Sequence, residues 1–312
     1  MLIIAVGAGA AVGFIARPGP TPTPPPTPTP VPTPEPDTGP LVFQQPLSSG
    51  CATSDDVFVV SNGGGIGLFD GKRWSLIDNT LRSLVNAACT RDTVLAVGGA
   101  GRVLVIDDVQ KTIRAEDVGI YDLNGISLLP DGALVVGEQG SVQRQSAQGW
   151  IPYAQGLDED LFGVAGFSAN SAWAVGAGGV SYRLEAQGWR PFDTGTTASL
   201  RTVAGSSASD AIAAGDDGVL LRFDGKWREL ASGVKTTLRA SVRAGGATYV
   251  TGDGGVVLQV TGGDVTRVEL GTSCAITGVF ARANEIWFVG SEGLHAGVWR
   301  RVGDRIERWG TC

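Results

Sequence analysis

The feature that most constrains the fold of this chain is a motif that returns seven times at a nearly regular spacing. Each copy is a short run of β-branched or aromatic residues that ends in a Gly-rich turn, as in VLAVGGAGRV, AWAVGAGGV and TYVTGDGGV. The residues that mark these turns are Asn62, Gly98, Gly137, Gly176, Gly215, Gly252 and Gly290. Successive markers are 36, 39, 39, 39, 37 and 38 residues apart, which predicts seven copies of one structural unit.

A single copy contains four short apolar runs separated by turns. Residues 200–230 show them as LRTVAGS, DAIAAG, VLLRF and WREL, with the turns DDG and DGK between the later runs. These runs are rich in Val, Leu, Ile and aromatic residues and are interrupted by Gly too often to be helices. The Asp-Gly pairs at 70–71 and 224–225 favour two-residue hairpins between a third and a fourth strand.

Seven four-stranded units with no helical segment between them predict an all-β fold, a seven-bladed β-propeller of antiparallel blades over residues 41–312. An open solenoid is the alternative. It would need atypical repeats at its ends, whereas the copies stay recognisable to residue 312. A Trp begins four of the fourth strands, and we expect these four residues to pack between blades: Trp74, Trp150, Trp189 and Trp227.

The first 40 residues differ from the repeats. Residues 1–17 begin with 16 uncharged residues before Arg17, which predicts a short hydrophobic helix that anchors the chain in a membrane, although 16 residues span only ~24 Å. A cleaved secretory signal is the alternative, but a basic N-terminal region is missing. The string GAGAAVG has the wrong glycine spacing for a dinucleotide-binding turn.

Residues 18–40 alternate Pro and Thr and contain 12 of the 16 prolines. Such a segment cannot form a core, and it favours extended polyproline II, so we expect a disordered stalk that reaches roughly 70 Å. The net charge of -7 and the absence of a run of Lys or Arg argue against a nucleic-acid partner.

The repeats and the AVGxxG turns resemble the broad group of BNR-like and YVTN-like bacterial seven-bladed propellers, which includes photosystem assembly factors and envelope proteins. The resemblance implies the fold and says little about function. An Asp-box has Ser two positions before its Asp, and here Leu68 and Arg222 stand there, so sialidase activity is not implied. The order of anchor, stalk and propeller also resembles the sensor half of bacterial receptor Ser/Thr kinases, whose kinase would lie upstream.

The four cysteines form two pairs with the same separation. Cys51 and Cys89 are 38 residues apart, and so are Cys274 and Cys312, which predicts disulfides between equivalent heights of neighbouring blades. A bond from Cys51 to Cys312 would instead join the ends of the ring, and four buried thiols are a further alternative. An even number of cysteines suits an exported domain. The single histidine, His295, has no companion at metal-ligand spacing, so we expect neither a metal site nor a cofactor.

The Gly-rich turns are the candidate binding site, because in a propeller they surround one mouth of the central channel. Five acidic residues of these turns form the predicted ring, which would hold a cation or a basic peptide unless they are ordinary solvated turn residues: Glu138, Asp216, Asp217, Asp253 and Glu292. One histidine gives no catalytic triad, so we do not expect an enzyme.

The predicted function is therefore a binding or sensor module of the cell envelope. It would be tethered through residues 1–17, or secreted if they are cleaved, and would recognise a protein, peptide or glycan. An envelope assembly scaffold is the alternative, and a carbohydrate-active hydrolase is a more distant one.

Overall fold

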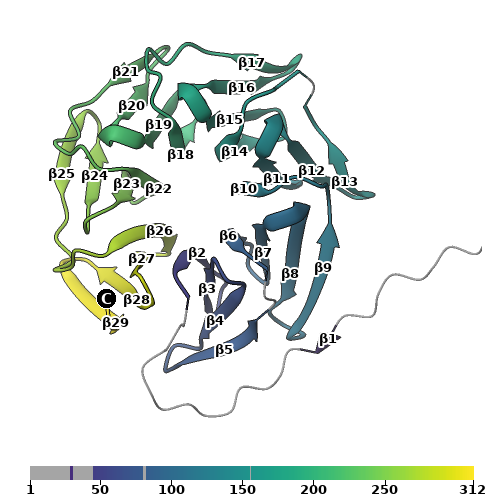
Figure 1. The fold of residues 1–312 in the computed structure, drawn as a ribbon, viewed down its shortest axis with the longest axis vertical. Helices are drawn as coiled ribbons and strands as arrows, with labels where there is room; N and C mark the ends of the chain where they lie inside the picture. The colour runs from purple at the N-terminus through teal and green to yellow at the C-terminus, as the bar shows by residue number, and fades with distance from the viewer. Residues whose placement is uncertain (1–28, 31–44, 80–81, 155) are drawn as a thin grey trace, which may run out of the picture.

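The computed structural model describes residues 29–30, 45–79, 82–154 and 156–312, and these form a ring of seven β-sheets around a central opening (Figure 1). The predicted seven-bladed propeller is confirmed. Blade 1 consists of β2 (Leu47–Ala52), β3 (Val57–Ser61), β4 (Gly65–Phe69) and β5 (Trp74–Asn79). Blade 2 consists of β6 (Leu84–Cys89), β7 (Thr93–Gly98), β8 (Arg102–Asp107) and β9 (Thr112–Asp117). Blade 3 consists of β10 (Leu123–Leu129), β11 (Gly132–Gly137), β12 (Val142–Ser146) and β13 (Gly149–Pro152).

Blade 4 consists of β14 (Leu161–Ser168), β15 (Ser171–Gly176), β16 (Ser181–Glu185) and β17 (Gly188–Pro191), and blade 5 of β18 (Leu200–Ser207), β19 (Asp210–Gly215), β20 (Leu220–Phe223) and β21 (Trp227–Glu229). Blade 6 consists of β22 (Leu238–Ala244), β23 (Ala247–Gly252), β24 (Val257–Thr261) and β25 (Asp264–Arg267). Blade 7 consists of β26 (Ala275–Arg282), β27 (Glu285–Glu292), β28 (His295–Val302) and β29 (Arg305–Gly310). Short 3-10 turns join the second and third strands of blades 2 to 5: η1 (Gly99–Gly101), η2 (Glu138–Gly140), η3 (Ala177–Gly179) and η4 (Asp216–Gly218).

Each blade is an antiparallel meander whose first strand lies nearest the central opening and whose last strand lies at the rim. The dipeptide β1 (Thr29–Pro30) pairs with β9 at the outer edge of blade 2. The other residues of the predicted anchor and stalk lie outside the described residues. Among the residues that the structure describes, no helix has the length and apolar composition that crossing a membrane requires.

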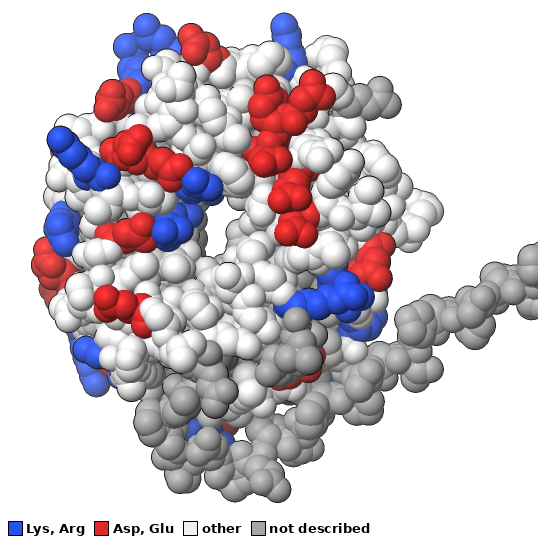
Figure 2. Space-filling view, in the orientation of Figure 1, with Lys and Arg blue, Asp and Glu red and all other residues white. Residues whose placement is uncertain are grey.

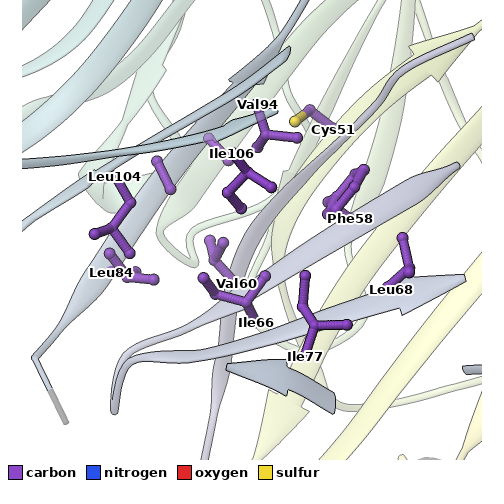
Figure 3. Close-up of a cluster of buried hydrophobic side chains, with 12 residues drawn as sticks. Cys51, Phe58, Val60, Ile66, Leu68, Ile77, Leu84, Val94, Leu104 and Ile106 are labelled. Atoms are coloured by element: carbon purple, nitrogen blue, oxygen red, sulfur yellow. The ribbon is translucent and has the colours of Figure 1, made fainter. Parts of the chain in front are cut away.

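The core lies between neighbouring blades. Figure 3 shows the cluster between blades 1 and 2, in which Phe58, Val60 and Ile66 of one sheet face Leu84 and Leu104 of the next. These side chains are at most 2% exposed. Burial of β-branched and aromatic side chains on both faces of each blade explains why the repeat runs are continuous rather than alternating.

The ring closes where blade 7 packs against blade 1. Phe69 and Trp287 meet there, with their ring centroids 5.8 Å apart, inside a mixed cluster of both blades. The Thr277 hydroxyl donates to the Leu47 carbonyl at 2.8 Å, and Arg282 donates to the Ser54 carbonyl at 2.6 Å. Side-chain packing and hydrogen bonds thus join segments about 230 residues apart.

The four Trp residues that begin fourth strands do pack between blades, as predicted. Trp150 donates its indole N–H to Glu116 of blade 2 at 2.6 Å, and Trp189 donates to the Tyr153 carbonyl at 3.2 Å. Trp227 donates to the Ser181 hydroxyl of blade 4 at 3.0 Å. Trp74 packs on Phe69 in the cluster that closes the ring. Each of these Trp side chains therefore joins the outer strand of its own blade to a neighbouring blade.

In blades 2 to 7 the marker glycine lies at or near the end of the second strand, where it pairs with a residue at the start of the first strand. The register pairs Leu84 with Gly98 in blade 2, but Leu47 with Ser61 in blade 1. The predicted marker Asn62 is therefore wrong by one residue. The marker φ values in blades 2 to 5 lie near 180°, so these glycines are needed for space rather than for a left-handed backbone.

We expect Gly176→Ala to lower the free energy of unfolding by about 3 kcal/mol, because its new Cβ would lie 2.0 Å from the Asp160 carbonyl oxygen. Gly178→Ala is the matched control. Gly178 has φ 61° with no described atom within 4 Å of a Cβ, and the equivalent Ala100 already adopts φ 56°. Gly178→Ala should lower the free energy of unfolding by only about 1 kcal/mol. Urea unfolding of both variants measures the difference, and equal midpoints would contradict this role of the marker glycines.

Both predicted disulfides form, Cys51–Cys89 and Cys274–Cys312. The first joins the inner strands β2 and β6 of neighbouring blades, as expected. The expectation of neighbouring blades is wrong for the second. Cys274 precedes β26 and Cys312 follows β29, so this bond ties the end of blade 7 to its own beginning.

Candidate functional site

A bulge in every inner strand builds the mouth of the central channel. In each blade the pairing of the first and second strands slips by one residue directly after a buried Leu or Ile, for example between Leu200 and Thr202. A bulge re-aims the extra side chain. The seven displaced residues, which we name the bulge ring, are Ser48, Val85, Asn124, Phe162, Arg201, Arg239 and Thr277.

The bulge ring lines both the channel and its mouth. The channel cavity has a volume of about 540 Å³, and a cavity of about 370 Å³ at the mouth shares all seven bulge-ring residues. Among the described residues that line the channel, only Arg201, Arg239 and Arg243 are charged. The wall is otherwise made of small, hydroxyl, amide and apolar side chains. A protein of net charge -7 thus has a channel in which the charged groups of the described lining are all cationic.

Two arginines of the bulge ring make the same ion pair in neighbouring blades. Arg201 binds Asp216 through Nε and Nη2, at 3.0 and 2.7 Å, and Arg239 binds Asp253 through Nε and Nη2, at 2.5 and 2.9 Å. Hydrogen bonds from Arg201 hold the pKa of Asp216 below its usual value. The Arg201 guanidinium also lies 4.6 Å from the centre of the Phe162 ring, a cation–π contact.

The five acidic residues of the predicted ring lie at the turns between second and third strands, except Glu292, which ends β27. They do not form a uniform acidic ring. Asp216 and Asp253 are neutralised by the bulge-ring arginines, and Asp217 lies beside Asp216 with a left-handed φ of 58°. Glu292 lies 3.9 Å from Cys274 Sγ, next to a cavity that His295 also lines. A binding role for these residues stays a prediction.

Glu138 has acidic neighbours that the repeat pattern did not indicate. Its backbone N–H donates to the Asp122 carbonyl, and the next N–H, of Gln139, donates to Asp160 Oδ1 at 2.9 Å. We name the following set the acidic arc: Asp122, Glu138, Asp158, Glu159 and Asp160. Figure 2 shows negative side chains running from the rim towards the opening over blades 3 and 4. The run LDEDL at 157–161 was the available sequence signal.

Glu159 of the acidic arc is held by a hydrogen bond from another side chain. The Tyr182 hydroxyl donates to Glu159 Oε2 at 2.7 Å, and this bond lowers the pKa of Glu159. Burial, with Glu159 adding to it, raises the pKa of Tyr182 to about 12. Glu159 is therefore ionised at neutral pH. Among the described residues, no group of three or more His, Cys, Asp or Glu side chains is placed to hold a metal ion.

His295 begins β28 and contacts the Thr311 hydroxyl through Nδ1 at 3.2 Å. It lines a cavity of about 340 Å³ beside the Cys274–Cys312 disulfide, together with Glu292 and Arg308. His295 is therefore an exposed residue at the start of a third strand.

No protein-family model matches the sequence, and no curated protein matches it. Solved propellers match the fold. The WD40 β-propeller domain of Doa1 is 13% identical with a TM-score of 0.71, over 87% of this chain and 95% of that one. The WD40 repeats of RRP9 are 8% identical with a TM-score of 0.68, over 78% and 87%. YCF48 bound to D1 peptide is 13% identical with a TM-score of 0.63, over 88% and 94%.

Proposed function

We propose that this chain is a non-catalytic binding module whose ligand lies across the channel mouth and contacts the bulge ring. The observation that carries the proposal is a contrast within the repeat. Seven buried Leu or Ile residues are repeated almost unchanged, whereas the next residue is Ser, Val, Asn, Phe, Arg, Arg and Thr in turn. A repeated scaffold that presents seven different side chains at one mouth is suited to recognition.

We further propose that the ligand is a protein or a peptide. Propellers of WD40 type, such as those of Doa1 and RRP9, share this fold, and YCF48 has been solved with a D1 peptide bound. The acidic arc on one side of the mouth and the two arginines on the other suit a ligand with separated charges. A glycan ligand is the alternative within this proposal.

The location that we propose is an oxidising compartment, the cell envelope or the exterior. Two disulfides in one domain support it, because such bonds persist in oxidising surroundings. Tethering through residues 1–17, membership of the BNR-like and YVTN-like group, and a layout like that of a receptor kinase stay predictions.

Site-specific photo-crosslinking in the producing cells tests the proposed face. A photoreactive amino acid replaces Asn124 or Thr277 at the mouth, and Arg190 or Glu229 on the outer strands serves as the control. We expect adducts from the mouth positions at a yield at least tenfold above that of the outer positions. Adducts confined to the outer strands would instead favour the alternative function, a scaffold for envelope assembly that binds through its rim.

A further inference from the structure

We infer that the channel mouth contains a carboxylate-binding site formed by Arg201 and Arg239, an inference that rests on the proposed binding function and names its ligand chemistry. Both arginines occupy the same bulge position, in blades 5 and 6, which are adjacent in the ring. Both line the mouth cavity of about 370 Å³ together with Phe162, Asn124 and Thr277. They are the only charged residues in this lining among those that the structure describes.

The pairing of each arginine leaves one edge of its guanidinium group directed away from the ion pair. Asp216 and Asp253 engage Nε and Nη2 of their partners, so Nη1 of Arg201 and of Arg239 stays outside these pairs. The arginines line the mouth cavity, whereas the two aspartates do not. Figure 2 agrees with this arrangement, since positive side chains border the opening over blades 5 and 6 and negative ones lie farther out.

The guanidinium groups are held in place before any ligand arrives. Asp216 accepts a further hydrogen bond from Thr237, and Phe162 supports the face of Arg201. Long arginine side chains lose conformational entropy when they bind, and groups that are already positioned lose less. Arg201 is 38% exposed and Arg239 is 44% exposed in their side chains, so both remain accessible to a ligand.

The neutral lining and the charge balance select a carboxylate. Asn124, Ser48 and Thr277 donate to the carbonyls of Leu161, Leu84 and Leu47. The arginines are therefore the charged donors towards the cavity, beside the amide of Asn62. The two arginines and two aspartates of the site together carry no net charge. A bound carboxylate therefore leaves the site with one net negative charge, whereas a bound phosphate leaves it with about -1.5 to -2. The fork of guanidinium donors fits a planar carboxylate.

The test is an NMR titration of the full 312-residue chain, labelled with ¹⁵N in arginine, with sodium acetate and then with inorganic phosphate. Acetate should move the side-chain signals of Arg201 and Arg239 with one shared saturation curve in the millimolar range. Arg102 is the internal control, because it binds Asp117 through the same Nε and Nη2 atoms but does not line the channel or its mouth. Equal shifts at Arg102, or tighter binding of phosphate, would overturn the inference.

Peptides separate the two sources of the carboxylate. If the site takes the C-terminus of a polypeptide, acetyl-tetraalanine with a free C-terminus should bind at least tenfold more tightly than acetate. If the site takes small carboxylates, the peptide and acetate should bind equally tightly. The amidated peptide, which has no carboxylate, should not bind in either case. Arg201→Gln and Arg239→Gln should each weaken acetate binding about tenfold, and Arg102→Gln should not. If acetate leaves Arg201 and Arg239 unmoved while crosslinks still form at the mouth, the carboxylate site is refuted and the binding function stands.

Discussion

Loss of either disulfide is expected to lower the free energy of unfolding by about 4 kcal/mol. Both bonds close loops of the same length, since Cys51–Cys89 and Cys274–Cys312 each span 38 residues. In the chain-entropy treatment, a loop of this size restricts the unfolded chain by about 4 kcal/mol at 25 °C. The variants Cys51→Ser with Cys89→Ser and Cys274→Ser with Cys312→Ser separate the two contributions.

The two bonds should also act on a particular part of the ring. The chain runs directly from blade to blade at six junctions, whereas blades 7 and 1 meet through side chains and hydrogen bonds such as that from Thr277 to Leu47. Cys51–Cys89 fastens blade 1 to blade 2, and Cys274–Cys312 closes blade 7 on itself. The disulfides therefore strengthen the two blades that flank this junction.

Hydrogen exchange with and without a reductant measures this effect. On reduction we expect the amides of β2–β5 and β26–β29 to lose protection first, because terminal units of a repeat array have one fewer chain-linked neighbour. The central blades 3 to 5 are the internal reference. A uniform loss of protection around the ring would show that the bonds stabilise the whole propeller equally, and would contradict the local role.

The sequence was sufficient to predict the architecture because local signals repeat. Each marker glycine follows an apolar strand and precedes another, and seven copies at one period leave few folds. The cysteine separation favoured the pairing that the structure shows, although it left a Cys51–Cys312 bond open, and it did not predict the position of the second bond. Cys274 belongs to the connection before β26, so a separation of one period joins the two ends of one blade rather than two neighbouring blades.

The channel mouth was harder to predict, for a physical reason. A bulge is set by the hydrogen-bond register of two strands, and the sequence carries no turn residue or glycine that marks it at Arg201 or Arg239. The turn aspartates were identified, but their partners lie 15 and 14 residues earlier on another strand. Two members of the predicted acidic ring thus became counter-ions of cationic residues that the pattern of turns did not reveal.

Trp173→Ala is expected to lower the free energy of unfolding by about 3–5 kcal/mol. Trp173 is fully buried in β15 of blade 4, and its ring centroid lies 4.8 Å from that of Phe223 and 5.0 Å from that of Trp227, both in blade 5. Its indole N–H donates to the Ala208 carbonyl of blade 5 at 3.0 Å. The substitution would leave a large cavity and an unpaired carbonyl at one blade junction.

The control for this prediction is Trp189→Ala, since Trp189 is a partly buried Trp of the same blade, and its loss should cost less than half as much. Urea unfolding measures both variants, with an unchanged dependence on urea as the sign that both remain two-state.

Phe162 of blade 4 and Arg201 of blade 5 meet across the same junction as Trp173. Trp173→Ala should therefore also weaken acetate binding in the folded protein, whereas Trp189→Ala should not. Unchanged acetate binding in Trp173→Ala would mean that the mouth is held by the inner strands alone.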